Sequence, residues 1–291
     1  MFHSLYLILK MMHNILKKLI KTKKYTLVKH KLKICLIFAL LLSSGCLCVS
    51  SQSVAELNKE KYYKLEINQY DYSVLNSYPQ AVVNIKNKKN KAVIKLKTHG
   101  TLNEYNAGGK LSAPFEKKLV PADLEKYLSS SDLIDYNEEN VMDIYHKLNL
   151  SSLSEYQCAK TILTFLVSVL KYDNELAAEI SSGLSCGKSA SWVLENKKGT
   201  CGEYSNLFIA LMRLKGIPCK FVTGLYCSSG QVTFHAWAEF YDARNGWVAV
   251  DPQGGILGVS SNHIKLKEGI DFADADFDMA KCDFKIRCIK K

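Results

Sequence analysis

Apolar and polar residues alternate along residues 232–240. Every second side chain is apolar, as in a β-strand with one face toward the core. These apolar residues are Val232, Phe234, Ala236, Ala238 and Phe240. A turn signal at residues 242–246 and a second apolar run at residues 247–251 follow. Pro252 cannot donate to a strand ladder, so we expect a β-hairpin that ends at Asp251.

A second stretch has the period of an amphipathic helix. Its apolar stripe consists of Leu207, Phe208, Leu211 and Leu214. Thr200 is a good N-cap, and Glu203 lies three residues later, which is the pattern of a capping box. Gly216 and Pro218 then end the helix. Cys201 therefore occupies the first helical position.

Shorter patterns predict the other elements. Two strands are expected at residues 81–85 and 92–96, joined by a hairpin loop rich in Lys and Asn at residues 86–91. Helices are expected at residues 121–128, 137–148, 154–170 and 189–196. Residues 47–75 are interpreted as a polar tether and a first ordered turn, and residues 103–114 and 183–188 as loops.

The N-terminal segment has the organisation of an export signal. Nine lysines precede a run of nine apolar residues at positions 34–42. This run is shorter than the roughly 20 residues that a membrane-spanning helix needs. Residues 43–46 resemble the bacterial lipoprotein signal, in which the cysteine, here Cys46, is lipidated, although Ser43 replaces the usual aliphatic residue. Lipidation, plain secretion after cleavage near residues 53–55 and an uncleaved membrane anchor all remain open. Each places the body of the protein outside the cytoplasm.

The net charge of +11 belongs to this N-terminal segment. Without its nine lysines the chain has 30 basic and 28 acidic residues, a net charge of +2. Nucleic-acid binding requires a concentrated basic surface on the folded body. We therefore expect no nucleic-acid partner, and we interpret the lysines of residues 86–91 as solvated.

No metal site is predicted. The ten cysteines include no CxxC pair, so a structural zinc site is not expected, and their disulfide pairing stays open. Four aspartates near the C-terminus offer oxygen atoms of the kind that calcium prefers. They are Asp271, Asp274, Asp276 and Asp278. They lack the glycine and the spacing of an EF-hand loop, so we interpret them as a solvated acidic loop.

Cys201, His235 and Asp251 suggest a nucleophile, its base and the residue that orients the base. Free N–H groups and the helix dipole at a helix start favour a thiolate. If Tyr241 pairs with Trp247, His235 and Asp251 are diagonal neighbours about 7–8 Å apart at Cα, within reach of a hydrogen bond. A slip of one residue would place them on opposite faces. Singly, each residue also has an ordinary structural interpretation, but all three together favour catalysis.

Five segments resemble the transglutaminase-like superfamily, over about residues 130–255 in total. They are residues 192–205, 211–218, 222–224, 235–240 and 246–252, which include GTCGEY, HAWAEF and GWVAVDP. The resemblance implies an α+β, papain-like fold, with the nucleophile on a central helix packed against an antiparallel sheet. We expect an export segment at residues 1–46, a tether and small β-rich region at 47–125, and a transglutaminase-like catalytic domain at 126–291.

The resemblance also implies chemistry. Cys201 would attack an amide carbonyl, His235 would protonate the leaving amine, and Asp251 would orient His235. Water would then release the acyl group in a peptidase or amidase, whereas an amine would release it in a cross-linking protein-glutamine transamidase. We favour hydrolysis, because an exported enzyme meets abundant water and no pattern indicates an acceptor-amine pocket. The expected partner is a protein or peptide substrate, with a membrane contact through the N-terminal anchor or lipid.

Some features stay open at this level. The family includes members that lack activity, so a non-catalytic cell-envelope binding module is the alternative from another functional class. No metal or organic cofactor is needed for the implied chemistry. The second oxyanion donor is not identifiable, and Trp192, Tyr172 and Asn174 are its candidates. Trp237 and Trp247 either line a substrate groove or pack the hairpin; these two tryptophans are in the segments that carry the resemblance.

Overall fold

The computed structural model describes residues 57–68, 70–102, 122–182, 187–275 and 284–289. The chain divides into two compact units, residues 47–177 with 186–291 and residues 1–46 with 178–185. The larger unit contains the sheets described for this chain, and helix α7 (Asn174–Ser182) has residues in both units. The predicted export segment with Cys46 and the predicted loop at residues 103–114 lie outside the described residues.

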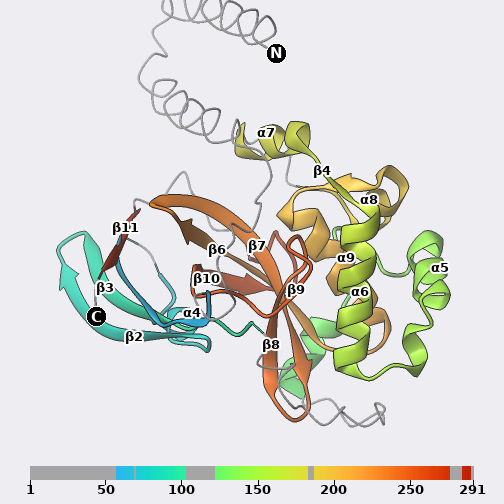
Figure 1. Ribbon diagram of the computed structural model, residues 1–291, viewed down its shortest axis with the longest axis horizontal. Coiled ribbons are helices and arrows are strands. Elements are labelled where there is room, and N and C mark those ends of the chain that lie inside the picture. The colour runs from blue at the N-terminus through green and yellow to red at the C-terminus, as the bar shows by residue number, and fades with distance from the viewer. Residues whose placement is uncertain (1–56, 69, 103–121, 183–186, 276–283, 290–291) are drawn as a thin grey trace, which may run out of the picture. The chain divides into compact units, whose positions relative to one another are not determined.

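A five-stranded antiparallel sheet forms the framework of the larger unit (Figure 1). Its order is β10-β6-β7-β8-β9. The strands are β6 (Cys219–Ser228), β7 (Gln231–Asp242), β8 (Gly246–Asp251), β9 (Ile256–Leu257) and β10 (His263–Gly269). Strands β7 and β8 form the predicted hairpin, and Tyr241 pairs with Trp247 as expected. Most side chains of β6, β7 and β8 are buried, because helices or a second sheet cover this framework.

Helix α9 (Cys201–Leu214) packs against β6 and β7. The predicted capping box is confirmed: the Thr200 side chain caps the helix, and Glu203 reaches back to the Thr200 backbone. Almost every residue of α9 is buried, including polar Ser205, Asn206 and Arg213. The predicted amphipathic stripe is therefore only part of what the fold covers, because other helices enclose α9 on its remaining sides.

Three helices surround α9 (Figure 1). They are α5 (Glu139–Lys147), α6 (Glu155–Val169) and α8 (Ala190–Asn196). Their apolar faces and those of α9, β6, β7 and β8 form one hydrophobic core, which includes Phe208, Phe221 and Phe240. Short elements complete this side: η1 (Ala122–Leu128), η2 (Leu150–Ser152), and the parallel pair β4 (Lys171–Tyr172) and β5 (Lys198–Gly199). The fold class is α+β, with the helix that begins at Cys201 packed against an antiparallel sheet, as predicted.

A second, four-stranded antiparallel sheet has the order β11-β1-β3-β2. Its strands are β1 (Lys61–Ile67), β2 (Gln80–Lys88), β3 (Lys91–Thr98) and β11 (Phe284–Ile289), with the short helix α4 (Tyr72–Leu75) between β1 and β2. The buried face of this sheet shares a hydrophobic cluster with Leu225 of β6 and with Ile264 and Leu266 of β10. The last strand of the chain thus completes the sheet that the N-terminal region begins.

The structure differs from the sequence predictions in several elements. Residues 61–67 form β1, although we expected a tether there, because β3 and β11 supply backbone partners on both sides. The hairpin between β2 and β3 turns at residues 89–90, so its strands are longer than predicted. Strands β9, β10 and β11 were not predicted. Among the described residues, no helix has both the length and the apolar composition to cross a membrane.

Candidate functional site

Cys201 stands at the first position of α9, and the chain around it is tightly fixed. Glu203 Oε2 accepts hydrogen bonds from Thr200 N at 2.8 Å and from Thr200 Oγ1 at 2.6 Å. Its other oxygen, Oε1, accepts from Lys188 N at 2.9 Å. Gly199 has no room for a β-carbon, because the Glu203 side chain occupies that space. These contacts hold the half-buried Cys201 at the positive end of the helix dipole.

His235 and Asp251 reach each other across the β7–β8 hairpin. His235 Nε2 lies 3.1 Å from Asp251 Oδ2, and both residues are more than nine-tenths buried. The predicted register is therefore the one that the sheet adopts. Since Nε2 faces the carboxylate, Nδ1 is the ring nitrogen left for the thiol. The Cys201 sulfur lies close enough to His235 to raise the pKa of its imidazole, so the structure brings all three predicted residues together.

The charges in this cluster depend on one another. Burial alone would lower the pKa of His235, but the Asp251 carboxylate and the Cys201 sulfur outweigh burial and raise this pKa well above its usual value. Burial would raise the pKa of Asp251, but the positive charge and hydrogen bonds of its histidine neighbours hold it well below its usual range. The arrangement thus favours an imidazolium beside an ionised carboxylate.

A fourth residue, which the sequence analysis missed, joins the cluster. His263 begins β10, and its Nε2 lies 3.5 Å from the same oxygen of Asp251. The other carboxylate oxygen, Oδ1, accepts a hydrogen bond from Gly254 N at 3.1 Å. His263 was missed because β10 itself was not predicted. The alternation of apolar Ile264 and Leu266 with lysines was the available signal for this strand.

Aromatic rings enclose the two histidines. Trp237 is almost fully buried, with its ring stacked 6.2 Å from His235 and edge-on 5.3 Å from His263. Tyr226 of β6 contacts the His263 ring at 5.0 Å between centroids. Gly224 has no β-carbon, and one there would collide with Trp237 and with β10. Trp237 therefore packs the hairpin and shields the cluster from water.

Trp247 has a different environment from Trp237. The Lys220 ammonium lies 3.9 Å from the centre of its ring, and the rings of Tyr127 and Tyr241 contact it edge-on. Trp247 thus packs the outer part of the hairpin through cation–π and aromatic contacts. In these contacts both tryptophans pack the hairpin, which is one of the two interpretations that the sequence left open.

Tyr172, one of the candidate oxyanion donors, lies near Cys201. It pairs with Gly199 in the β4–β5 ladder, two residues before the cysteine. Tyr172 is 42% exposed overall, but partial burial of its phenol, together with the neighbouring Cys201 and Glu203, raises the pKa of the phenol, so the hydroxyl stays protonated and able to donate. Trp192 lies on α8 with Lys188 over its ring, and no described contact links it to Cys201.

One group of side chains among the described residues could together hold a metal ion. It consists of His235, Asp251 and His263, whose ligand atoms all lie within 4.8 Å of one another. Asp271 and Asp274 instead accept backbone hydrogen bonds within their own loop, and Asp276 and Asp278 lie outside the described residues. Contacts with the Asp251 carboxylate account for the arrangement of both histidines.

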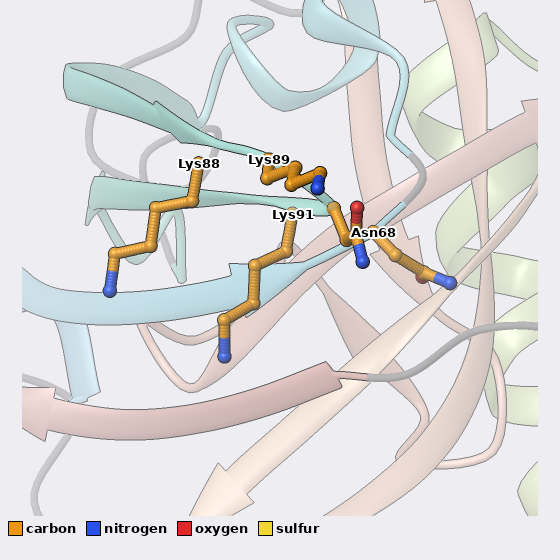
Figure 2. A pocket seen from close by; sticks show the side chains of 5 residues that line it. Asn68, Lys88, Lys89 and Lys91 are labelled. Atoms are coloured by element: carbon orange, nitrogen blue, oxygen red, sulfur yellow. The ribbon is translucent and has the colours of Figure 1, made fainter.

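The hairpin lysines lie in a separate open pocket (Figure 2). Lys88, Lys89 and Lys91 line it together with Asn68, and none of the three predicted catalytic residues takes part. Lys91 also forms an ion pair with Glu66 at 2.9 Å. Lys88 and Lys89 are exposed, and Lys91 is half-buried.

Part of this chain matches a known protein family. Residues 144–252 match the family model of the transglutaminase-like superfamily. This segment is a transglutaminase-like core. It contains Cys201, His235 and Asp251. A structure described as a candidate cysteine protease from Cytophaga hutchinsonii has the same fold, with a TM-score of 0.54 and 15% identity, over 79% of this chain and 86% of that one.

Curated relatives match other limited parts of the chain. A protein-glutamine gamma-glutamyltransferase of Pseudomonas aeruginosa is 28% identical over 71 residues, which are 21% of this chain and 11% of that protein. An uncharacterized protein of Mycobacterium tuberculosis is 25% identical over 167 residues, which are 53% of this chain and 52% of that protein. The chain thus spans about a tenth of the first relative and about half of the second.

Proposed function

We propose that this protein is a cysteine-dependent acyl-transfer enzyme that acts on amide bonds of peptides or proteins. Cys201 is the nucleophile, His235 the general acid and base, and Asp251 the residue that orients His235. One observation carries the proposal: the cysteine that begins α9 neighbours His235, whose Nε2 lies 3.1 Å from Asp251 Oδ2. This is the geometry of an activated nucleophile.

The reaction follows from the protonation states. The Cys201 thiolate attacks the amide carbonyl carbon, and its oxygen gains the negative charge. The backbone N–H at the start of α9 and the Tyr172 hydroxyl are the proposed donors to that oxyanion. The C–N bond breaks as His235 gives its proton to the leaving nitrogen, which leaves a thioester on Cys201. A second nucleophile then attacks the thioester and passes a proton to His235.

Hydrolysis is our preferred outcome, with water as the second nucleophile and a carboxylic acid as the product. The export segment expected from the sequence would place the enzyme where water is abundant. Transamidation is the second candidate, because a similar segment occurs in the Pseudomonas aeruginosa protein named as a protein-glutamine gamma-glutamyltransferase. In that case an amine would take the acyl group from Cys201.

Two assays test this proposal on the same variants. We expect iodoacetamide to alkylate Cys201 faster than it alkylates thiols of the urea-unfolded protein, as mass spectrometry of the Cys201 peptide would show. We also expect turnover of a glutamine-containing casein, seen as new amino termini or as ammonia release. Cys201→Ser should abolish turnover, whereas Cys288→Ser should keep it, because Cys288 is an exposed free thiol in β11.

The results also separate the candidates. Incorporation of a labelled primary amine into casein, dependent on Cys201, would replace hydrolysis by transamidation. A native Cys201 that is alkylated no faster than an unfolded thiol, with no turnover above that of Cys201→Ser, would contradict the enzyme proposal. The non-catalytic binding module would then be the better interpretation.

A further inference from the structure

Two histidines contact Asp251, and the proposed mechanism uses only one of them, His235. The Oδ2 atom of Asp251 lies 3.1 Å from His235 Nε2 and 3.5 Å from His263 Nε2. We propose that His263 is a positioning residue whose Nε2–H donates to Asp251 and keeps this carboxylate ionised and aimed at His235. The proposal rests on the function proposed above, and it makes the site a group of four residues.

The surroundings of His263 Nδ1 determine which ring nitrogen carries the proton. Ser260 N donates to Nδ1 at 3.2 Å, and the Ser260 hydroxyl lies 3.1 Å away. A neutral imidazole whose Nδ1 accepts a hydrogen bond carries its proton on Nε2. The Ser260 carbonyl oxygen also lies 3.2 Å from Nδ1. A proton on Nδ1 would leave the lone pair of Nε2 facing the Asp251 carboxylate, and this arrangement is unfavourable.

Burial makes Asp251 the partner that His263 has to use. The His263 side chain is 5% exposed, and its Nε2 makes no hydrogen bond of ordinary geometry to a described residue, so the Asp251 oxygen at 3.5 Å is the acceptor within reach. A buried donor without a partner is costly. The separation of 3.5 Å is longer than a well-formed hydrogen bond, and hydrogen bonds of catalytic groups often tighten only when substrate binds.

Charge and packing both favour a neutral His263. Burial, reinforced by the positive charge of His235, lowers the pKa of His263 below its usual value despite the opposing effect of Asp251. A neutral donor stabilises the carboxylate without competing with the imidazolium of His235. The rings of Tyr226 and Trp237 fix the plane of the His263 ring at centroid separations of 5.0 and 5.3 Å. In this dry environment a hydrogen bond to a charged group is strong.

The test measures the pH dependence of Cys201 alkylation by iodoacetamide in the full chain, followed on the Cys201 peptide. His263→Leu removes the donor, whereas His263→Gln keeps an N–H donor at about the position of Nε2. We expect His263→Leu to lower the alkylation rate at neutral pH by about tenfold, the effect of losing a hydrogen bond to a charged group, and to move the pH midpoint of alkylation upward. His263→Gln should retain most of the rate.

The control is His146→Leu, because His146 is an exposed histidine of α5, and it should behave as wild type. Circular dichroism and urea midpoints establish that each variant folds. If His263→Leu does not fold, His263→Asn replaces it, because the Asn side chain is too short to reach Asp251. The expected order is then wild type, His263→Gln and His263→Asn, from fastest to slowest.

Three outcomes would overturn the positioning role. The first is a pH profile of Cys201 alkylation in His263→Leu that equals that of wild type. The second is an alkylation rate in His263→Gln that is as low as in the variant without a donor in reach. The third is a change of the wild-type profile on treatment with EDTA. The last would mean that a metal ion, not Asp251, is the partner of His263 Nε2. Failure of the proposed function is a separate result, since it would appear as an unreactive Cys201 in the wild-type protein.

Discussion

At the scale of single residues, the site depends on a buried carboxylate with several donors. Asp251 is 8% exposed, and an unpaired charge at that depth would strongly destabilise the fold. His235 and His263 approach one of its oxygens, and Gly254 N donates to the other. The same contacts that make the buried charge tolerable also set the orientation of His235. Stability and reactivity are therefore linked at this residue.

This linkage predicts how stability depends on pH. In the folded protein the pKa of Asp251 lies well below its usual range, so in acid the unfolded chain binds more protons at this residue. The stability that Asp251 contributes is fully present above its unfolded pKa of about 3.9 and is lost as the pH falls toward the folded pKa. We expect the free energy of unfolding to fall more steeply with acid in wild type than in Asp251→Asn.

Urea unfolding between about pH 3 and 5 measures this difference, since histidines with ordinary pKa values are protonated there in the unfolded chain. The raised pKa of His235 keeps that residue protonated in the folded protein as well. Parallel profiles for wild type and Asp251→Asn would mean that Asp251 is not held as an anion in the folded state.

At the scale of elements, the start of α9 has two roles. Thr200 and Glu203 satisfy each other in a capping box, and the same turn presents Cys201 to His235. Helix α6 begins with a second capping box, formed by Ser154 and Gln157. The two helix starts are alike in hydrogen bonding, but only one of them holds a member of the proposed site. They therefore allow the stabilising role of a cap to be separated from its effect on the thiol.

We expect Thr200→Ala and Ser154→Ala each to lower the free energy of unfolding by about 1 kcal/mol, the usual effect of losing an N-cap. Only Thr200→Ala should also slow alkylation of Cys201 by iodoacetamide, because it loosens the turn that positions the sulfur. Urea unfolding and alkylation rates on the same samples provide the measurements. Equal alkylation rates in the two variants would argue that the Thr200 cap only stabilises the helix.

At the scale of the whole molecule, we propose that the N-terminal segment exports the protein, so that the folded body would act outside the cytoplasm. That segment carries the excess of positive charge and a short apolar run before Cys46.

The second sheet contributes Leu96 and Ile94 to a cluster shared with β10, the strand that begins with His263. The second sheet is therefore packed against a strand that carries a member of the proposed site.

If the lipoprotein signal is used, a bacterium that expresses the full chain should incorporate radiolabelled palmitate into it. Cys46→Ala should abolish the label, because the thiol of Cys46 is the proposed attachment point. Cys48→Ala is the matched control, two residues away, and should stay labelled. Label that persists in Cys46→Ala would contradict the lipoprotein proposal and leave plain secretion or an uncleaved anchor.

The sequence by itself determined the local parts of this protein. The capping box before Cys201 and the alternation on both arms of the β7–β8 hairpin depend on residues close together in the chain, and both are present as predicted. The placement of His235 beside Asp251 followed from the hairpin register, which is also local. Helical periodicity likewise predicted α6, although the predicted ends extended one residue beyond the helix on each side.

Only the tertiary structure decided which distant segments meet. Strand β1 pairs with β11 across more than two hundred residues, and β10 pairs with β6 although β7, β8 and β9 lie between them in the chain. A strand of mixed polarity gains its stability from partners that no local pattern names. His263 therefore became visible as a neighbour of Asp251 only once β10 was placed in the sheet. Local periodicity encodes elements, whereas a shared carboxylate requires the packing of strands far apart in the chain.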